Sequence, residues 1–342
     1  MKKTIYSISL FALLIAAFVL GGCVTVPAAA PAAPAGEAAA PADASAGIPR
    51  PAACDAEKPF IAVALPNLSN PYYVAMKQGF EESAAAAGFE VEVQIADNSD
   101  ERQLAQVLTM LEKKPCALAL NGNKSEPAAA IVKSANDAGV PVFTVNVTVD
   151  PEAIKDQGAV IVQYLGADNY AGGQQGADMV MKDLGADAAL KIGFVTEPDE
   201  VPTVVRDQGF EDTIKANPNA EIVAKVDGNV RPDDSMKVTT ELLAGNPDIN
   251  VIWASTGPGT YGALQALQSL GNTDIQLYGF CAADEPVTGQ YRGCVGQEPY
   301  DYGARVIGQI KEWLGGATPA PEILRPLKTF TTGETPAPGE VG

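Results

Sequence analysis

The chain has 342 residues, with 42 acidic against 23 basic side chains, a formal net charge of −19 and no histidine. This length suits about two domains of ordinary size, and a hydrophobic fraction of 46% is enough to build buried cores. The acidic balance argues against nucleic-acid binding, which needs clustered Lys or Arg for the phosphates. The lack of histidine excludes Ser-His-Asp and Cys-His catalytic pairs and any histidine-ligated metal.

An export signal is predicted over residues 1–22. Lys2 and Lys3 precede an apolar run over 5–20, and the sequence Leu-Gly-Gly-Cys ends at Cys23. This ending is similar to a bacterial lipobox, which implies that Cys23 carries the lipid as the first residue of the mature protein. An uncleaved membrane anchor is the alternative. Both interpretations place the body of the protein outside the cytoplasmic membrane, and acyl chains would hold it on the membrane surface.

Residues 23–57 are rich in Ala and Pro without helical or strand periodicity, so we predict a tether. Export permits disulfides between the remaining cysteines. Cys54 precedes the first expected strand and Cys116 opens another, which places both thiols at the same edge of a parallel sheet and predicts a bridge between them. Cys281 and Cys294 lie at the end of one expected strand and within the next, so a second bridge is feasible. Free buried thiols are the alternative for both pairs.

Short β-branched runs alternate with amphipathic stretches along the rest of the chain. In the first half we expect strands at 60–65, 91–95, 116–120, 141–147 and 159–165, with helices at 71–87, 104–113 and 127–138. In the second half we expect helices at 170–184, 203–216, 233–244 and 261–270, with strands at 191–195, 221–226, 251–254 and 276–280. This alternation predicts an α/β fold of two doubly wound lobes, each built on a parallel sheet.

Two such lobes imply a crevice between them, and ligands of open parallel sheets sit at the carboxyl ends of the strands. The loops at those ends are rich in neutral polar groups and poor in catalytic ones. They are residues 66–73, 121–123, 146–148, 197–206, 255–259 and 281–283. The sequence therefore predicts a binding site rather than a catalytic one.

Six segments carry a resemblance to a known family. They are Asn70-Pro-Tyr-Tyr73 and residues 139–144, 166–172, 206–210, 262–267 and 278–280. In this order they resemble the type I periplasmic sugar-binding proteins, the ribose-binding-like group of ABC importers, from Phe60 to about Thr331. The resemblance implies three hinge strands joining the lobes, with crossings near Ala167, Glu298 and Arg325. Lobe 1 would be 58–166 plus 298–325, with a helix over 301–314, lobe 2 would be 167–297 plus 326–333, and 334–342 would be a flexible tail.

The resemblance also implies ligand-binding residues. Tyr72 and Tyr73 match the aromatic clamp of the family, whose rings stack on a sugar face, with plain core packing as the alternative. Asn70 matches a polar contact beside the clamp, although Asn before Pro also suits a helix cap. Arg206 matches the cleft arginine, whose planar fork can donate to two ligand oxygens; an arginine on the helix surface is the alternative. Gln297 matches the hinge glutamine, which can both donate and accept.

Four residues at three places in the implied site depart from the family pattern. Asn146 and Val147 stand where the group has an Asp-Arg pair, Thr256 stands in place of an asparagine, and Cys281 in place of an aspartate. Hydrogen bonds to charged groups are worth roughly 1.5 to 3 kcal/mol, so these changes should weaken binding of a ribose-like sugar. We keep Asn146, Thr256 and Cys281 as ligand contacts. We expect a sugar derivative, deoxysugar, polyol or other small polar molecule rather than ribose.

Other interpretations of the sequence are weaker. Gly257, Gly259 and Gly262 match the dinucleotide pattern G-x-G-x-x-G, but no partner for nicotinamide chemistry accompanies them. A tight turn explains these glycines equally well, and the N–H groups at the helix start could also bind a ligand oxygen. The acidic runs at 97–101 and 233–234 lack the glycine and closing glutamate of a calcium loop. A repressor of this fold would need a basic helix-turn-helix in place of the signal and tether.

The sequence thus predicts a lipid-anchored, extracytoplasmic solute-binding subunit of an ABC importer. It would be a monomer that captures a small neutral sugar, sugar derivative or polyol between its lobes and delivers it to a membrane permease. We expect no enzyme activity, cofactor, metal or nucleic acid. The alternative is a ligand sensor of the same fold that signals to a membrane receptor or kinase.

Overall fold

A computed structural model describes residues 49–342 and builds them into two α/β lobes. The first lobe begins with β1 (Phe60–Leu65), α1 (Pro71–Ala87), β2 (Glu90–Ile95), α2 (Asp100–Glu112), β3 (Ala117–Leu120), α3 (Ala128–Asp137), β4 (Val142–Val145), α4 (Pro151–Asp156) and β5 (Gln163–Ala167). The second lobe follows with α5 (Asn169–Leu184), β6 (Leu190–Thr196), α6 (Val201–Ile214), β7 (Ala220–Asp227), α7 (Pro232–Gly245), β8 (Val251–Ala254), α8 (Gly257–Leu270), β9 (Gln276–Phe280) and β10 (Tyr291–Gly296). The chain ends with α9 (Pro299–Leu314), β11 (Glu322–Arg325) and β12 (Lys328–Thr331).

Each lobe is centred on a doubly wound sheet. The strand order is β11-β5-β4-β3-β1-β2 in the first sheet and β12-β10-β9-β8-β6-β7 in the second. The named strands pair in parallel except β12, which runs antiparallel to β10. The chain passes between the sheets after β5, after β10 and after β11. The fold class predicted from sequence, with three connections between two parallel-sheet lobes, is confirmed, while the lobe boundaries stay predictions.

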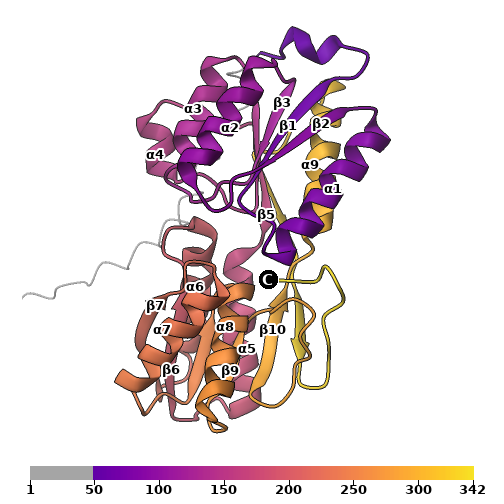
Figure 1. The fold of residues 1–342 in the computed structure, drawn as a ribbon. Helices are drawn as coiled ribbons and strands as arrows, with labels where there is room; N and C mark the ends of the chain where they lie inside the picture. Colours follow the sequence, from indigo (N-terminus) through magenta and orange to yellow (C-terminus); the bar gives the residue numbers. More distant parts are fainter. Residues whose placement is uncertain (1–48) are drawn as a thin grey trace, which may run out of the picture. The chain divides into compact units, whose positions relative to one another are not determined.

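Helices cover both faces of the first sheet. α1 and α9 lie side by side on one face, although more than 200 residues separate them in sequence, and α2, α3 and α4 cover the other face (Figure 1). α1 and α9 approach closely because two glycines face the neighbouring backbone. A Cβ on Gly79 would lie 2.2 Å from the Tyr300 carbonyl oxygen, and one on Gly303 would lie 2.3 Å from that of Met76. The predicted assignment of the helix over 301–314 to the first lobe agrees with this packing.

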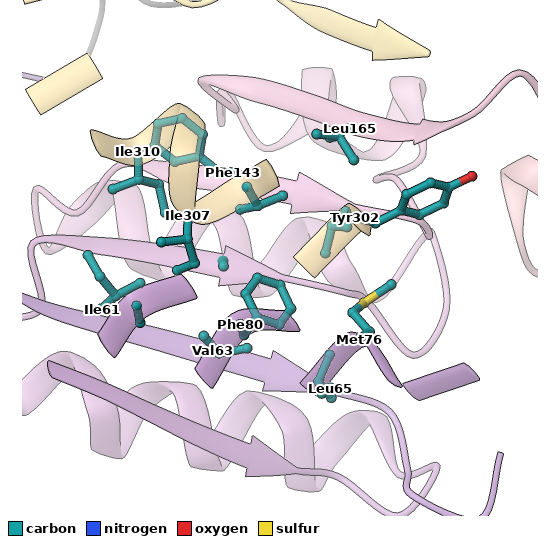
Figure 2. Close-up of a cluster of buried hydrophobic side chains, with 14 of the residues drawn as sticks. Ile61, Val63, Leu65, Met76, Phe80, Phe143, Leu165, Tyr302, Ile307 and Ile310 are labelled. Atoms are coloured by element: carbon teal, nitrogen blue, oxygen red, sulfur yellow. The ribbon is translucent and has the colours of Figure 1, made fainter. Parts of the chain in front are cut away.

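The core of the first lobe lies between its sheet and the pair α1 and α9 (Figure 2). Its labelled side chains are Ile61, Val63 and Leu65 of β1, Met76 and Phe80 of α1, Phe143 of β4, Leu165 of β5, and Tyr302, Ile307 and Ile310 of α9. Each large apolar side chain buried here stabilises the fold by about 1.5 to 3 kcal/mol. This packing fixes the first turn of α1, which carries part of the site.

An aromatic stack holds α6 against the second sheet. The rings of Phe210 and Trp253 lie 4.6 Å apart at 29°, and the Phe194 ring meets Phe210 edge-on at 5.3 Å. Offset and edge-to-face pairs of this kind add roughly 0.5 to 1.5 kcal/mol beyond the area that they bury. Because Phe210 lies one helical turn beyond Arg206, the stack fixes the height and rotation of that arginine over the sheet.

Several boundaries differ from the sequence predictions. α2 and α8 each begin one turn earlier than expected, because Ser99 and Thr256 accept hydrogen bonds from N–H groups of the first turns. α4 is not expected from periodicity, although Asp150 caps it. The strand expected at 159–165 begins only at Gln163, because the Val160 N–H bonds the Asn136 side chain instead of a neighbouring strand.

Both predicted disulfides form. Cys54 is bonded to Cys116 with their Cα atoms 4.7 Å apart, and Cys281 is bonded to Cys294 with a Cα separation of 4.9 Å. The first bridge lies where the structure differs from the predicted tether over 23–57. Residues Ala52–Asp55 form a 3-10 turn, because the buried Cys54 ties this part of the 23–57 range to the first sheet.

The predicted export signal over 1–22 and the lipidation residue Cys23 lie outside the described residues. Across 49–342, the helices are too short or too polar to qualify as membrane-spanning segments.

Candidate functional site

All predicted ligand-binding residues except Cys281 meet at one cavity between the two lobes. The cavity measures about 20 Å³ and is lined by Asn70, Tyr72, Tyr73, Asn146, Glu200, Arg206, Val230, Thr256, Gln297 and Gly342. Cys281 lines a neighbouring cavity of about 500 Å³ instead. A third cavity of about 370 Å³ adjoins the first one through Tyr73, Glu200 and Val230. The smallest cavity has room for about one water molecule, so a sugar would need the lobes or their loops to rearrange.

Tyr72 and Tyr73 contribute two buried phenols from the first turn of α1. Their ring centroids lie 5.3 Å apart at an interplanar angle of 81°, so the rings meet edge to face rather than as parallel plates. The Tyr72 hydroxyl donates to Asn146 Oδ1 at 2.8 Å and lies 3.3 Å from Gln297 Oε1. Burial raises the pKa of both phenols well above the usual value, so both remain protonated donors.

Asn70 and Thr256 are helix caps at opposite sides of the cavity. Asn70 Oδ1 accepts from Tyr72 N at 2.9 Å at the start of α1. Thr256 Oγ1 accepts from Gly259 N at 3.1 Å at the start of α8. Each cap uses an acceptor lone pair, so the Asn70 amide N–H groups and the Thr256 hydroxyl proton can still donate elsewhere. Capping and ligand binding are therefore compatible at both residues.

Asn146 follows β4 with φ at 60°, in the left-handed region that asparagine tolerates better than most residues. The Tyr164 hydroxyl donates to the Asn146 carbonyl oxygen at 2.9 Å and holds this backbone in place. The conformation directs the Asn146 amide toward Tyr72. Asn146 therefore both accepts a hydrogen bond from the Tyr72 hydroxyl and lines the cavity.

Arg206 on α6 is buried, with 4% of its surface exposed, so the alternative of a surface arginine is wrong. Its Nε donates to Asn169 Oδ1 at 2.8 Å and its Nη1 donates to the Ser255 carbonyl oxygen at 2.8 Å. The guanidinium carbon lies 3.9 Å from the centre of the Phe280 ring. Burial lowers the pKa of Arg206, yet a guanidinium stays charged in proteins. These contacts orient the fork and leave Nη2 as a donor.

Two acidic residues of the site were missed by sequence reasoning. Glu197 and Glu200 belong to the loop between β6 and α6, one of a set of loops that the sequence analysis describes as rich in neutral polar groups. Burial, followed by the charge of Asp227, raises the pKa of Glu197 to about 7. Burial, followed by the charge of Glu197, raises the pKa of Glu200 to about 8. Their position after a strand was a usable signal, but their burial was not readable from the sequence.

The segment 334–342, predicted as a flexible tail, is packed and hydrogen-bonded at its end in the structure. Val341 is only 4% exposed, and its carbonyl oxygen accepts from Gln297 N at 2.7 Å. Gly342 N donates to the Cys281 carbonyl oxygen at 2.9 Å, and Gly342 lines both the cavity of about 20 Å³ and that of about 500 Å³. The backbone of this segment therefore satisfies polar groups of the hinge and the site, which is why its end is held in place.

The glycines of the dinucleotide-like pattern serve packing. Gly257 and Gly259 lie within the first turn of α8 rather than in a loop. A Cβ on Gly257 would lie 2.5 Å from the Gly342 carbonyl oxygen, and one on Gly262 would lie 2.4 Å from that of Pro232. Close backbone approach thus explains the glycines without a dinucleotide. No cluster of three potential metal ligands occurs within residues 49–342.

The two lobes touch at the rim of the site. Ser125 N, from the first lobe, donates to the Asp199 carbonyl oxygen at 3.0 Å, and the Ser125 hydroxyl accepts from Val201 N at 2.9 Å. Lys124 and Asp199 also form an ion pair across this boundary. A ligand in the cavity would therefore be enclosed by residues from both lobes.

Known proteins resemble this chain in sequence and in fold. Residues 61–318 match the periplasmic binding protein domain family. The ribose import binding protein of Bacillus subtilis (strain 168) is 29% identical over 279 residues, covering 79% of this chain and 87% of the relative. A solved periplasmic solute binding protein of an ABC transporter from Actinobacillus succinogenes, with bound D-allose, has a TM-score of 0.72 at 26% identity, covering 80% of this chain and 98% of that one.

A second solved structure has similar coverage. The myo-inositol binding protein of Caulobacter, bound to myo-inositol, has a TM-score of 0.70 at 26% identity and covers 80% of this chain and 93% of that one. The resemblance inferred from short segments is thus confirmed by a match across most of the chain. This protein belongs to the periplasmic binding protein domain family.

Proposed function

We propose that this protein is the solute-binding subunit of an ABC importer and captures a sugar, sugar derivative or polyol between its lobes. One observation carries the proposal. All residues predicted from sequence to bind ligand except Cys281 line one partly open cavity, with Tyr72 and Tyr73 from the first lobe and Arg206 and Thr256 from the second. Relatives of the same fold are named for ribose import and for myo-inositol binding, and a third holds bound D-allose, which supports a polyhydroxylated ligand.

Binding would favour the enclosed arrangement because the ligand contacts both lobes at once. A ligand shifts a conformational equilibrium only by as much as its affinities for the two states differ. Phenol, amide and guanidinium donors suit hydroxyl oxygens, and the tyrosine rings supply apolar surface for C–H groups. The ligand leaves unchanged, and a membrane permease recognises the closed form.

A ligand panel tests this proposal. The full chain would be screened by thermal shift against pentoses, hexoses, deoxysugars and cyclitols, with isothermal titration calorimetry for each hit. We expect at least one sugar or polyol to raise Tm and to bind with one-to-one stoichiometry, because a ligand that binds only the folded protein stabilises it. A screen in which amino acids or peptides stabilise the protein and carbohydrates do not would refute the proposal.

The membrane anchor is part of the same proposal. Cys23 would carry the lipid and hold the protein at the outer surface of the cytoplasmic membrane. Expression in a bacterial host with a labelled fatty acid should give a labelled membrane-bound protein, and Cys23→Ser should release unlabelled protein. Equal labelling of the two proteins would show that Cys23 is not the attachment site.

A further inference from the structure

Two buried carboxylates of the site lack a cationic partner. Glu197 and Glu200 are 3% and 8% exposed, and neither forms an ion pair within residues 49–342. Glu197 Oε1 accepts a hydrogen bond from Asp199 N at 3.2 Å. The Glu200 carboxylate has no hydrogen-bond partner in the described part of the chain, and its oxygens keep some accessible surface although the residue as a whole is buried. Buried acidic groups are costly unless they are paired or protonated, so a carboxylate in this position needs an explanation.

Glu200 faces the proposed ligand site. It lines the smallest cavity together with Tyr72, Tyr73 and Arg206, and it also lines the adjoining cavity of about 370 Å³ together with Glu197. It is therefore the acidic residue that connects the two spaces. A ligand that contacts the tyrosines and extends toward Glu197 would pass this carboxylate.

The nearby basic groups are already engaged. Lys124 pairs with Asp199, and Arg231 Nε pairs with Asp234 Oδ2 at 3.2 Å. Arg206 donates to neutral oxygens and lies over the Phe280 ring. Burial, followed by the charge of Glu197, raises the pKa of Glu200 to about 8, although the charges of Arg206 and Lys124 act in the opposite direction. A cation entering the cavity would reverse this effect and stabilise the ionised form.

Helix capping does not account for Glu200. The residue occupies the N-cap position of α6, but its side chain makes no cap hydrogen bond. Acidic residues near a helix start gain some stabilisation from the helix dipole. That gain requires no burial, and a solvent-exposed carboxylate would obtain it without losing hydration. The buried, cavity-facing placement thus points to a ligand.

We propose that the ligand carries a protonated amine, as an amino sugar does, and that Glu200 receives this amine. The inference rests on the proposed function and refines it, because the sequence analysis predicts a neutral ligand. Glu200 is the acidic residue in the lining of the smallest cavity, where Asn146 and Thr256 are neutral. An ammonium–carboxylate hydrogen bond is stronger than a neutral one.

Matched ligands measure the contribution of the amine to affinity apart from that of the rest of the sugar. Calorimetry on the full chain would compare glucosamine, glucose and N-acetylglucosamine, and the same three forms of galactose and mannose. For at least one sugar, we expect the amine form to bind at least tenfold more tightly than the neutral and acetylated forms. Glu200→Gln should reduce that ratio to about one, whereas Glu112→Gln, at an exposed position on α2, should leave it unchanged.

The outcomes distinguish this inference from the proposed function. Neutral sugars that bind as tightly as their amine forms would overturn the amine inference and leave the importer function standing. A preference for amines that persists in Glu200→Gln would overturn the role of Glu200. If sugars of neither kind bind, the proposed function fails and this inference fails with it. If circular dichroism shows that Glu200→Gln is misfolded, the affinities of the amine and N-acetyl forms for the unmodified chain still test whether the ligand carries an amine.

Discussion

Arg206 is fixed before any ligand arrives. The Asn169 side chain, the Ser255 carbonyl and the Phe280 ring hold its guanidinium from three directions. A donor fixed in this way loses little conformational entropy when it binds, which is the advantage of pre-organisation. The free Nη2 is therefore the strongest single donor that the second lobe can offer.

Arg206→Ala should weaken ligand binding by tenfold or more, because a hydrogen bond from a charged group is worth about 1.5 to 3 kcal/mol. Arg206→Lys should lose nearly as much, since an ammonium cannot reproduce the fork. Calorimetry with the best ligand of the panel measures both effects. Arg102→Ala, which removes an exposed arginine of α2, serves as the control. Unchanged affinity in a folded Arg206→Ala protein would remove this residue from the site.

The two buried glutamates predict a pH dependence of stability. Their pKa values of about 7 and about 8 in the folded protein exceed the ordinary value near 4.5. Between these values the folded state holds protons that the unfolded state releases, so stability falls as the pH rises from about 5 to about 8. Below about 4.5 this contribution is fully present, and above about 8 it is lost.

Urea denaturation measures this effect. The free energy of unfolding should be lower at pH 8.5 than at pH 5.5 by more than about 1 kcal/mol, since one pKa unit corresponds to about 1.4 kcal/mol. Glu200→Gln should flatten the profile because its amide does not titrate. A profile that rises over the same range would show that these acids are ionised in the folded protein.

Residue types at the site were predictable, but their contacts were not. Motif position alone indicated Tyr72, Arg206 and Gln297, because each lies in a segment with a fixed place in the fold. Glu200 lies in a loop that the sequence also indicated, yet its burial comes from tertiary packing around a cavity that it shares with Tyr73 of the first lobe. Such a tertiary effect leaves no local pattern in the sequence.

The segment 337–342 occupies space that a ligand would use. Its backbone bonds Gln297 and Cys281, and Glu340 ties it to Lys328 with 2.5 Å between Oε1 and Nζ. Two backbone hydrogen bonds, worth about 0.5 to 1.5 kcal/mol each, oppose its displacement together with the Glu340–Lys328 ion pair and the buried Val341 side chain. A ligand therefore has to compete with part of its own binding protein.

Deletion of residues 337–342 should increase ligand affinity by up to about tenfold, by removing this competition. Val341→Ala keeps the backbone contacts and should bind like the unmodified chain. Calorimetry on the deletion variant, Val341→Ala and the unmodified chain measures whether the segment competes with the ligand. A deletion that weakens binding would instead make the segment a part of the ligand site.

The Cys54–Cys116 bridge closes a separation of 62 residues, against 13 for Cys281–Cys294. The chain-entropy estimate is about 4 kcal/mol for the longer loop and about 3 kcal/mol for the shorter one. Cys54→Ser with Cys116→Ser should therefore lower the free energy of unfolding by roughly 2 to 4 kcal/mol in urea titrations. Loss of less than about 0.5 kcal/mol would show that the turn at 52–55 contributes little to the fold.

Elements were predictable where periodicity and capping agree. α1 runs from Pro71 to Ala87 as expected, because Asn70 caps it and Gly88 ends it with φ at 81°. The strand near residue 160 was misplaced because its first residues are β-branched yet bond a side chain of α3. β11 and β12 are short and half-exposed, so neither carries the continuous apolar run that identifies a buried strand.

At the scale of the molecule, the function depends on two lobes that share one ligand. The resemblance predicted this arrangement, because three chain crossings and repeated α/β order determine the fold class more firmly than any single element. The ligand itself was not predictable, since specificity arises from a few contacts such as that of Glu200, which differ between proteins of one fold. Contacts at Ser125 and Asp199 show that the lobes can meet across the site.

A crystal structure of the full chain with the tightest ligand of the panel tests the central claim most directly. We expect density for the ligand between the lobes, with Arg206 Nη2 and the Tyr72 or Tyr73 side chain in contact with it and residues 341–342 displaced. Density for the ligand at a site formed by one lobe alone, with residues 341–342 still bonded to Gln297 and Cys281, would contradict the account.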